Sequence, residues 1–263
     1  MVQLIQPYHL VSISPWPLLI SLNLIFFFFR IILFFKGNGI KFIVWSFLIL
    51  LIILFQWNRD LIRERTYLGD HTIKVIDGIK WGIKIFILSE VAFFFRVFYC
   101  FIYLSLSPDC HIGSNWPPKN IEIIDPFSIP LLNTIILLCS GVTLTLCHYS
   151  LILYKWRMRF KSLIFTVFLG IVFSYIQYLE YDDAIFTISD SRFGSIFFFS
   201  TGFHGFHVFL GTIMLLIILV RIKFGHFFDG NHVGLEFSIW YWHFVDVVWL
   251  LLYLRVYLFT RIR

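Results

Sequence analysis

Four polar side chains with chemical potential lie in apolar stretches toward the C-terminal end of the chain. Asp246 follows His243 by three positions inside the stretch WYWHFVDVVWLL, and His207 follows His204 by three positions inside TGFHGFHVFLGT. Residues three apart share one face of a helix. A charged group in the middle of a bilayer costs at least about 2.5–3.5 kcal/mol. These side chains are therefore expected to face protein, water or a partner rather than lipid.

The composition of the 263 residues is that of a membrane protein. Hydrophobic residues make up 59% and charged residues 14% of the chain, and the mean hydropathy is +0.86. A soluble domain carries about 25% charged residues. With this hydropathy, the net charge of +6 points to an anionic lipid surface and not to nucleic acid. The four cysteines have no C-x-x-C spacing, so neither a disulfide nor a zinc framework is expected, and no metal ligand is assigned.

Seven apolar runs are long enough to cross a bilayer, which takes about 20 helical residues. The second is short but can continue as a polar helical extension through Glu64. The chain is therefore predicted to be an all-α, polytopic membrane protein with seven transmembrane helices, forming one domain over residues 1–263. Helices 1–2 are placed at about 15–66 and helices 3–7 at about 72–259, with apolar runs at 17–35, 42–57, 84–106, 129–154, 162–179, 193–220 and 235–259.

Basic and acidic connections alternate along the chain. The second-to-third and fourth-to-fifth connections are rich in Lys and Arg, whereas the intervening ones are acidic and include Glu180, Asp182, Asp183 and Asp190. Cytoplasmic-type loops carry the excess of basic residues. The N-terminus and the even-numbered connections are therefore predicted on the inner side, although Lys36, Lys41, Arg261 and Arg263 oppose this orientation.

Glu90 is the carboxylate of the third run. Counting helical rise from the inner ends puts Glu90 within about one turn of the depth of His207. A hydrogen bond from Glu90 to His207 or His204 is one hypothesis. Three other roles stay open for this residue: a protonated carboxyl that serves packing, a group that handles protons, or a contact with a lipid headgroup.

Two further interpretations follow from the intramembrane residues. His148, His204, His207 and His243 could ligate haem in a membrane electron carrier, because histidines hold haem in many redox proteins. Glu90 and Asp246 could line the pathway of a transporter, but that class often shows inverted repeats, and none is visible in this sequence.

A mixed cluster of Trp, Arg, Glu and His is predicted on the inner side. Arg binds phosphate bidentately, so such a cluster suits an anionic phospholipid headgroup. The alternative is an ordinary aromatic belt with positive-inside charges. The cluster comprises the end of the second run and the end of the sixth: Trp57, Arg59, Arg63, Glu64, His71, Arg221 and His226.

A series of short motifs runs in order along nearly the whole chain. The motifs include SPWP (14–17), RD and RE (59–60 and 63–64), SEV (89–91), WPP (116–118), PLLNT (130–134), FTISD (186–190), TGFHGFHV (201–208) and YWHFVDVVWL (241–250). Together they resemble the family of cytochrome c oxidase subunit III, of the mitochondrial type.

The resemblance implies a non-catalytic, seven-helix subunit of a proton-pumping terminal oxidase that passes electrons from cytochrome c to oxygen. Such a subunit carries no haem and no copper; haem a and copper belong to partner subunits. It flanks subunit I, and its first two helices are separated from the other five by a V-shaped cleft that holds phospholipid. Subunits I and II, accessory subunits and membrane lipids are the implied partners. The mitochondrial inner membrane, with the N-terminus on the matrix side, is the implied location.

The resemblance also implies roles for single residues. The lipid is expected to be a phosphatidylglycerol, a phosphatidylethanolamine or a cardiolipin, and the subunit to support proton uptake and stability. Glu90 corresponds to the helix-three carboxylate, and His204 and His207 become interhelical hydrogen-bonding groups. Arg96 stands where the family has a small residue. The lipid-contact positions are Trp57, Glu64, His71, Arg221 and His226, with Arg63 added from the cluster.

Overall fold

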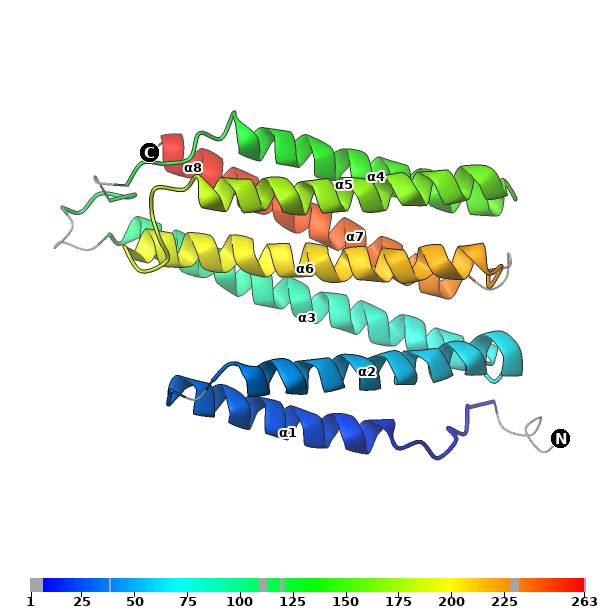
Figure 1. Ribbon diagram of the computed structural model, residues 1–263. Coiled ribbons are helices and arrows are strands. Elements are labelled where there is room, and N and C mark those ends of the chain that lie inside the picture. Colours follow the sequence, from blue (N-terminus) through cyan, green and yellow to red (C-terminus); the bar gives the residue numbers. More distant parts are fainter. Residues whose placement is uncertain (1–6, 38, 109–112, 119–120, 228–231, 263) are drawn as a thin grey trace. The chain divides into compact units, whose positions relative to one another are not determined.

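The computed structural model describes residues 7–37, 39–108, 113–118, 121–227 and 232–262, and the regular structure there is entirely helical (Figure 1). Seven helices are long and apolar enough to cross a membrane, which confirms the predicted fold class. The elements are α1 (Trp16–Phe35), α2 (Lys41–Arg63), the π-helical segment η2 (Glu64–Leu68), α3 (Ile73–Leu106), α4 (Ile129–Ile152), α5 (Trp156–Asp182), α6 (Arg192–Lys223), α7 (Val233–Leu252), the π-helical segment η4 (Tyr253–Leu258) and α8 (Phe259–Ile262).

Two helices extend beyond their apolar runs. Helix α2 and η2 continue without a break to Leu68, as the polar extension predicted. Helix α3 begins at Ile73, whereas the apolar run begins only at Lys84. Its 34 residues span about 51 Å, against about 30 Å for the hydrocarbon core. The first turns of α3 carry charged residues and extend beyond the length that the hydrocarbon core requires. A count of apolar residues therefore does not place the start of the helix.

The chain divides into two compact units, Met1–Ile79 (unit 1) and Lys80–Arg263 (unit 2). This boundary falls inside α3, a few residues beyond the predicted boundary between helices 2 and 3; the assignment of a single domain stays a prediction. In unit 1, α1 packs on α2 around one buried polar contact, in which Asn23 Nδ2 donates to the Ser46 carbonyl at 3.0 Å. Most other side chains of the pair are exposed and apolar, which is the pattern of a lipid-facing surface.

Unit 2 has a dense core in which helices approach closely around Trp242. A Cβ added at Gly211 would lie 2.8 Å from the Trp242 ring, and one at Gly170 would lie 2.7 Å from it. Small residues allow this approach between membrane helices. The indole of Trp242 donates to Ser140 Oγ at 2.9 Å, so its polar atom is satisfied inside the apolar core. The helices of unit 2 are thus fixed by shape and by hydrogen bonds together.

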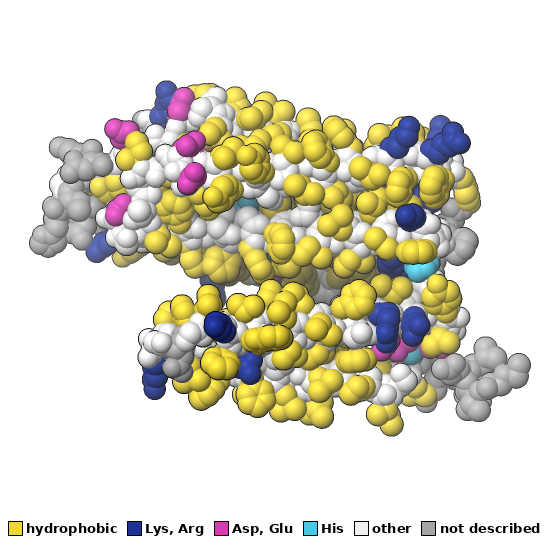
Figure 2. Space-filling model, in the orientation of Figure 1, with side chains coloured by type: hydrophobic (Ala, Val, Ile, Leu, Met, Phe, Trp, Pro, Cys, Tyr) yellow, Lys and Arg dark blue, Asp and Glu magenta, His cyan; other side chains and the backbone are white. Residues whose placement is uncertain are grey.

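The surface of each unit carries hydrophobic side chains along the middle of its helices (Figure 2). In unit 2, the acidic side chains on this face gather at the left end of the helices, and most of the Lys and Arg side chains gather at the right end, with a few at the left. This separation agrees with the alternation seen in the sequence, and the orientation in the membrane stays a prediction. Two acidic residues assigned to a loop lie within α5: Asp182 is its last residue, and Glu180 is buried, where its carboxylate accepts a hydrogen bond from Tyr257 at 2.6 Å. Their assignment to an acidic connection was wrong.

Candidate functional site

A cavity of about 290 Å³ opens in unit 1 beside the C-terminal half of α2. Three residues of the predicted lipid cluster line it, namely Trp57, Arg63 and Glu64. The start of α1 closes one side, where the Trp16 indole donates to Asp60 Oδ2 at 2.8 Å. The cavity therefore combines two indole rings, a guanidinium group and two carboxylates.

The chain reverses direction after η2 and brings His71 close to Glu64. The helix ends after η2 at Gly69, whose φ of 69° is a left-handed conformation that glycine adopts without strain. The Asp70 N–H then donates to the Glu64 carbonyl at 3.2 Å. His71 consequently lies near Glu64 although it does not line the cavity.

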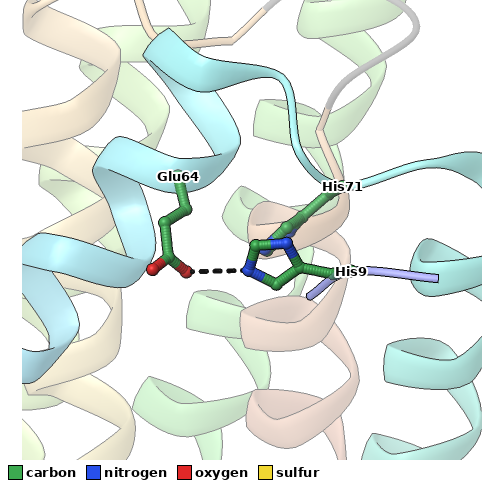
Figure 3. A group of neighbouring side chains, drawn as sticks. All are labelled: His9, Glu64 and His71. Atoms are coloured by element: carbon green, nitrogen blue, oxygen red, sulfur yellow. Dashed lines mark hydrogen bonds and ion pairs between the residues drawn. The ribbon is translucent and has the colours of Figure 1, made fainter. Parts of the chain in front are cut away.

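His9, in the segment before α1, lies together with Glu64 and His71, as Figure 3 shows. His9 Nε2 is 3.3 Å from Glu64 Oε2, and the rings of His9 and His71 meet edge to face with centroids 5.5 Å apart. Burial, the charge of Arg65 and the neighbouring His9 lower the pKa of His71. His71 is thereby biased toward the neutral imidazole.

Arg221 and His226, the other two predicted lipid contacts, lie together in unit 2. Helix α6 ends at Lys223, Gly225 takes a left-handed φ of 70°, and the His226 N–H donates to the Arg221 carbonyl at 3.0 Å. The Arg221 guanidinium lies over the Phe227 ring, 4.6 Å from its centroid. Burial and the charge of Arg221 lower the pKa of His226.

Glu90 and His207 form the hydrogen bond that their depths suggested. Glu90 Oε2 lies 2.9 Å from His207 Nε2, which joins α3 to α6 within unit 2. His207 Nδ1 lies 2.7 Å from the Phe203 carbonyl oxygen, which can only accept, so Nδ1 carries a proton. The Glu90–Nε2 contact therefore holds a single proton, either on a neutral carboxyl or on an imidazolium paired with a carboxylate.

His204 does not make the interhelical hydrogen bond that the resemblance implied. Its ring is buried beside Phe173 and Trp249, with centroids 5.7 and 5.1 Å away. Among the described residues, neither ring nitrogen has a hydrogen-bond partner. A spacing of three residues leaves two side chains about 60° apart around the helix. His207 thus meets α3, whereas His204 meets aromatic rings of α5 and α7.

The remaining intramembrane residues lie apart from this pair. Asp246 is buried, and its Oδ2 lies 3.4 Å from Nδ1 of the half-buried His243. The ring of His148 lies 5.8 Å from that of His232. Haem ligation by the four histidines does not fit this arrangement, because both nitrogens of His207 are occupied and aromatic rings pack on His204.

Sequence reasoning missed His9 as a member of any site. It is 55 positions from Glu64, and no local periodicity connects the two. It lies seven residues before α1 in a chain with nine histidines, and its residue type alone does not indicate a site.

The chain is similar to one family over nearly its whole length. The family model described as "Cytochrome c oxidase subunit III" matches residues 6–261. The cytochrome c oxidase subunit 3 of Drosophila melanogaster is 47% identical over 252 residues, which cover 96% of each chain. The subunits of Heterololigo bleekeri and Lumbricus terrestris are each 46% identical over 252 residues, which cover 96% of this chain and 97% of theirs.

The family match at residues 6–261 includes all seven membrane helices and the two groups of candidate lipid contacts. The chain therefore belongs to the cytochrome c oxidase subunit III family and is a multi-pass subunit of the terminal oxidase complex.

Proposed function

We propose that this chain is a non-catalytic core subunit that binds structural phospholipid in the oxidase. In this proposal it flanks subunit I, assembles with subunit II and accessory subunits, and supports proton uptake and stability. Haem a and copper belong to the partner subunits and not to this chain. The subunit lies in the mitochondrial inner membrane with its N-terminus on the matrix side, and its first two helices are separated from the other five by a lipid-filled cleft.

The cavity lined by Trp57, Arg63 and Glu64 is the observation that carries the lipid proposal. A guanidinium group binds a phosphate through two parallel hydrogen bonds, and tryptophan is favoured at the level of the headgroups. The volume of about 290 Å³ suits a headgroup. The acyl chains would lie along the exposed apolar flank of α2, which includes Leu54 and Phe55.

Glu64 favours a headgroup with a hydrogen-bond donor. A carboxylate repels a bare phosphate but accepts a hydrogen bond from an ammonium or hydroxyl group. Phosphatidylethanolamine and phosphatidylglycerol carry both a phosphate for Arg63 and a donor for Glu64. The second lipid contact would be Arg221 with His226 in unit 2, where the guanidinium is half-buried beside Phe227.

The described polar pairs inside the helices serve packing in this proposal. Glu90 with His207, Asp246 with His243 and Glu180 with Tyr257 each join side chains at hydrogen-bonding or ion-pair distance. The support for proton uptake would be indirect, through the flank of subunit I that the bound lipid stabilises.

Lipid mass spectrometry on the purified oxidase tests the proposal with two matched variants. Arg63→Gln removes a charge that lines the cavity. Arg59→Gln removes the same charge four residues earlier on α2, from a side chain that is paired with Asp60 at 2.9 Å and does not line the cavity. We expect the Arg63 variant to lose one class of co-purifying phospholipid by at least about tenfold, since a charge-assisted bond contributes about 1.5–3 kcal/mol.

The Arg59 variant should retain the wild-type lipid content. Equal lipid content in both variants and the wild type would reject the cavity as a phospholipid site. Dissociating the subunit should leave the haem a absorbance with the partner subunits, and haem that stays with this chain would reject its non-catalytic role.

A further inference from the structure

His9, Glu64 and His71 come from three separate segments and point toward one another (Figure 3). His9 lies in the segment before α1, Glu64 opens η2, and His71 lies in the turn before α3. Each offers one nitrogen or oxygen atom, and these three atoms all lie within 4.8 Å of one another. Two imidazoles and one carboxylate form a ligand set that divalent zinc uses in proteins.

The distances suit a tetrahedral ion. Zinc bonds of about 2.0–2.1 Å to nitrogen and oxygen place neighbouring ligand atoms about 3.3 Å apart. His9 Nε2 and Glu64 Oε2 are already 3.3 Å apart. The ligand atom of His71 would need to approach by at most about 1.5 Å, a displacement that side-chain rotation can supply.

The site is also largely enclosed. The side chains of His9 and Glu64 are 12% and 17% exposed. Nδ1 of His71 is buried and has no hydrogen-bond partner among the described residues. A buried polar atom without a partner costs about 1–3 kcal/mol. An ion at this point would bind or reorient the His71 ring and relieve part of that cost.

Contacts other than those of the cluster hold His9 in place. The Thr72 hydroxyl donates to the Pro7 carbonyl. The Lys74 ammonium lies over the Tyr8 ring, 5.9 Å from its centroid. The N-terminal segment is thus fixed against the turn before α3, and the ligand set is assembled in advance.

We propose that His9, Glu64 and His71 bind a divalent transition-metal ion, with Zn²⁺ as the best match and water as the fourth ligand. Imidazole ligands select zinc over magnesium and calcium, which take oxygen ligands. The absence of a cysteine framework does not bear on this site, because none of the three ligands is a cysteine. The ion would fasten the N-terminal segment to the connection between α2 and α3.

This inference goes beyond the proposed lipid function and can fail independently of it. Glu64 and His71 belong to both sites, whereas His9 does not line the lipid cavity. His9 therefore separates metal binding from lipid binding.

The test is zinc uptake by the intact oxidase. Purified oxidase is treated with a chelator, titrated with an enriched zinc isotope and analysed by mass spectrometry for bound isotope, in wild type and in the His9→Gln variant. We expect the wild type to bind one zinc ion per complex more than the variant does. Its affinity for that ion should be at least about tenfold higher than that of the variant. The lipid content of the variant should be unchanged.

His226→Gln in unit 2 is the matched control, because it removes a histidine of the proposed lipid contacts and none of the metal ligands. It should lower lipid content and leave zinc uptake unchanged. Glu64→Gln is a second ligand variant, which serves as the test if the His9 variant fails to assemble. It should lose the same zinc ion. Equal zinc uptake by the wild type and the ligand variants would overturn the proposal, whatever their lipid content.

Discussion

Unit 1 and unit 2 use similar apolar helices in opposite ways. In the most apolar windows of α1 and α2, 6% and 11% of residues are buried, against 39–56% in the four helices α4 to α7. In unit 1 the contact of Asn23 with Ser46 is the buried one of three described hydrogen bonds between α1 and α2. Unit 2 has a continuous core that contains two fully buried tryptophans, Trp242 and Trp249. Apolar composition alone therefore does not distinguish a helix that faces lipid from one that packs on protein.

The difference has a physical cause. Between membrane helices there is no hydrophobic drive, since lipid tails are as apolar as leucine. Association therefore depends on small residues, shape and interhelical hydrogen bonds. Unit 2 supplies these through Gly170, Gly211 and Ser140 around Trp242, and unit 1 has few equivalents in its described residues. The apolar flanks of unit 1 are therefore left exposed.

The strongest test of this comparison is removal of one tryptophan from each unit. Trp242→Ala takes away a side chain that is 0% exposed and touches two glycines, and it should lower the free energy of unfolding by about 3–5 kcal/mol. Trp45→Ala takes away a ring that is 64% exposed in unit 1 and should change it by less than about 0.5 kcal/mol. SDS titration of the purified oxidase, followed through unfolding of this subunit, measures both. Similar losses would show that unit 1 also packs its large side chains against protein.

Replacing a glycine by alanine should change the free energy of unfolding in opposite directions in the two units. Gly170→Ala in unit 2 places a Cβ 2.7 Å from the Trp242 ring and should destabilise by about 1–3 kcal/mol. Gly78→Ala in unit 1 meets no atom within 4 Å among the described residues and should stabilise by about 0.4–1 kcal/mol. The same SDS titration reads both changes. A neutral Gly170 variant would mean that the Trp242 ring can move aside.

The smallest expected effect concerns a histidine that each unit places just outside its spans and near an arginine. The pKa of His226 lies below its ordinary value of 6.5, because burial and Arg221 disfavour the imidazolium. Just below pH 6.5 the unfolded chain binds more protons than the folded chain. The stability that the neutral His226 contributes is therefore complete above pH 6.5, and it is lost as the pH falls through the lowered pKa of the folded state.

Acylation of His226 by diethyl pyrocarbonate measures this shift, because only the neutral ring reacts. The midpoint should move upward in Arg221→Gln, which removes the neighbouring charge and leaves the burial. His71 offers the comparison in unit 1, where burial and Arg65 lower the pKa in the same direction. An unchanged midpoint in the Arg221 variant would leave burial as the sole cause.

Features that depend on neighbouring residues were predicted better than contacts between residues far apart in the chain. The seven spans, the extension of α2 past Trp57 and the shared face of His243 and Asp246 were all predicted correctly, because each depends on spacing within one helix. Helix α3 starts at Ile73, close to the predicted start at about residue 72, although its apolar run begins only at residue 84. Glu180 was misplaced because its hydrogen-bond partner Tyr257 is 77 positions away, and a local pattern cannot show such a contact.

The sequence by itself determined the membrane class, the number of helices and, through ordered motifs, the subunit III family. Only the tertiary structure decided that Glu90 bonds to His207 while His204 packs among aromatic rings, and that His9 joins Glu64 and His71. Helical periodicity is a property of neighbouring residues and can be read locally. The rotation of each helix about its axis, and the meeting of segments far apart in the chain, depend on how whole helices pack.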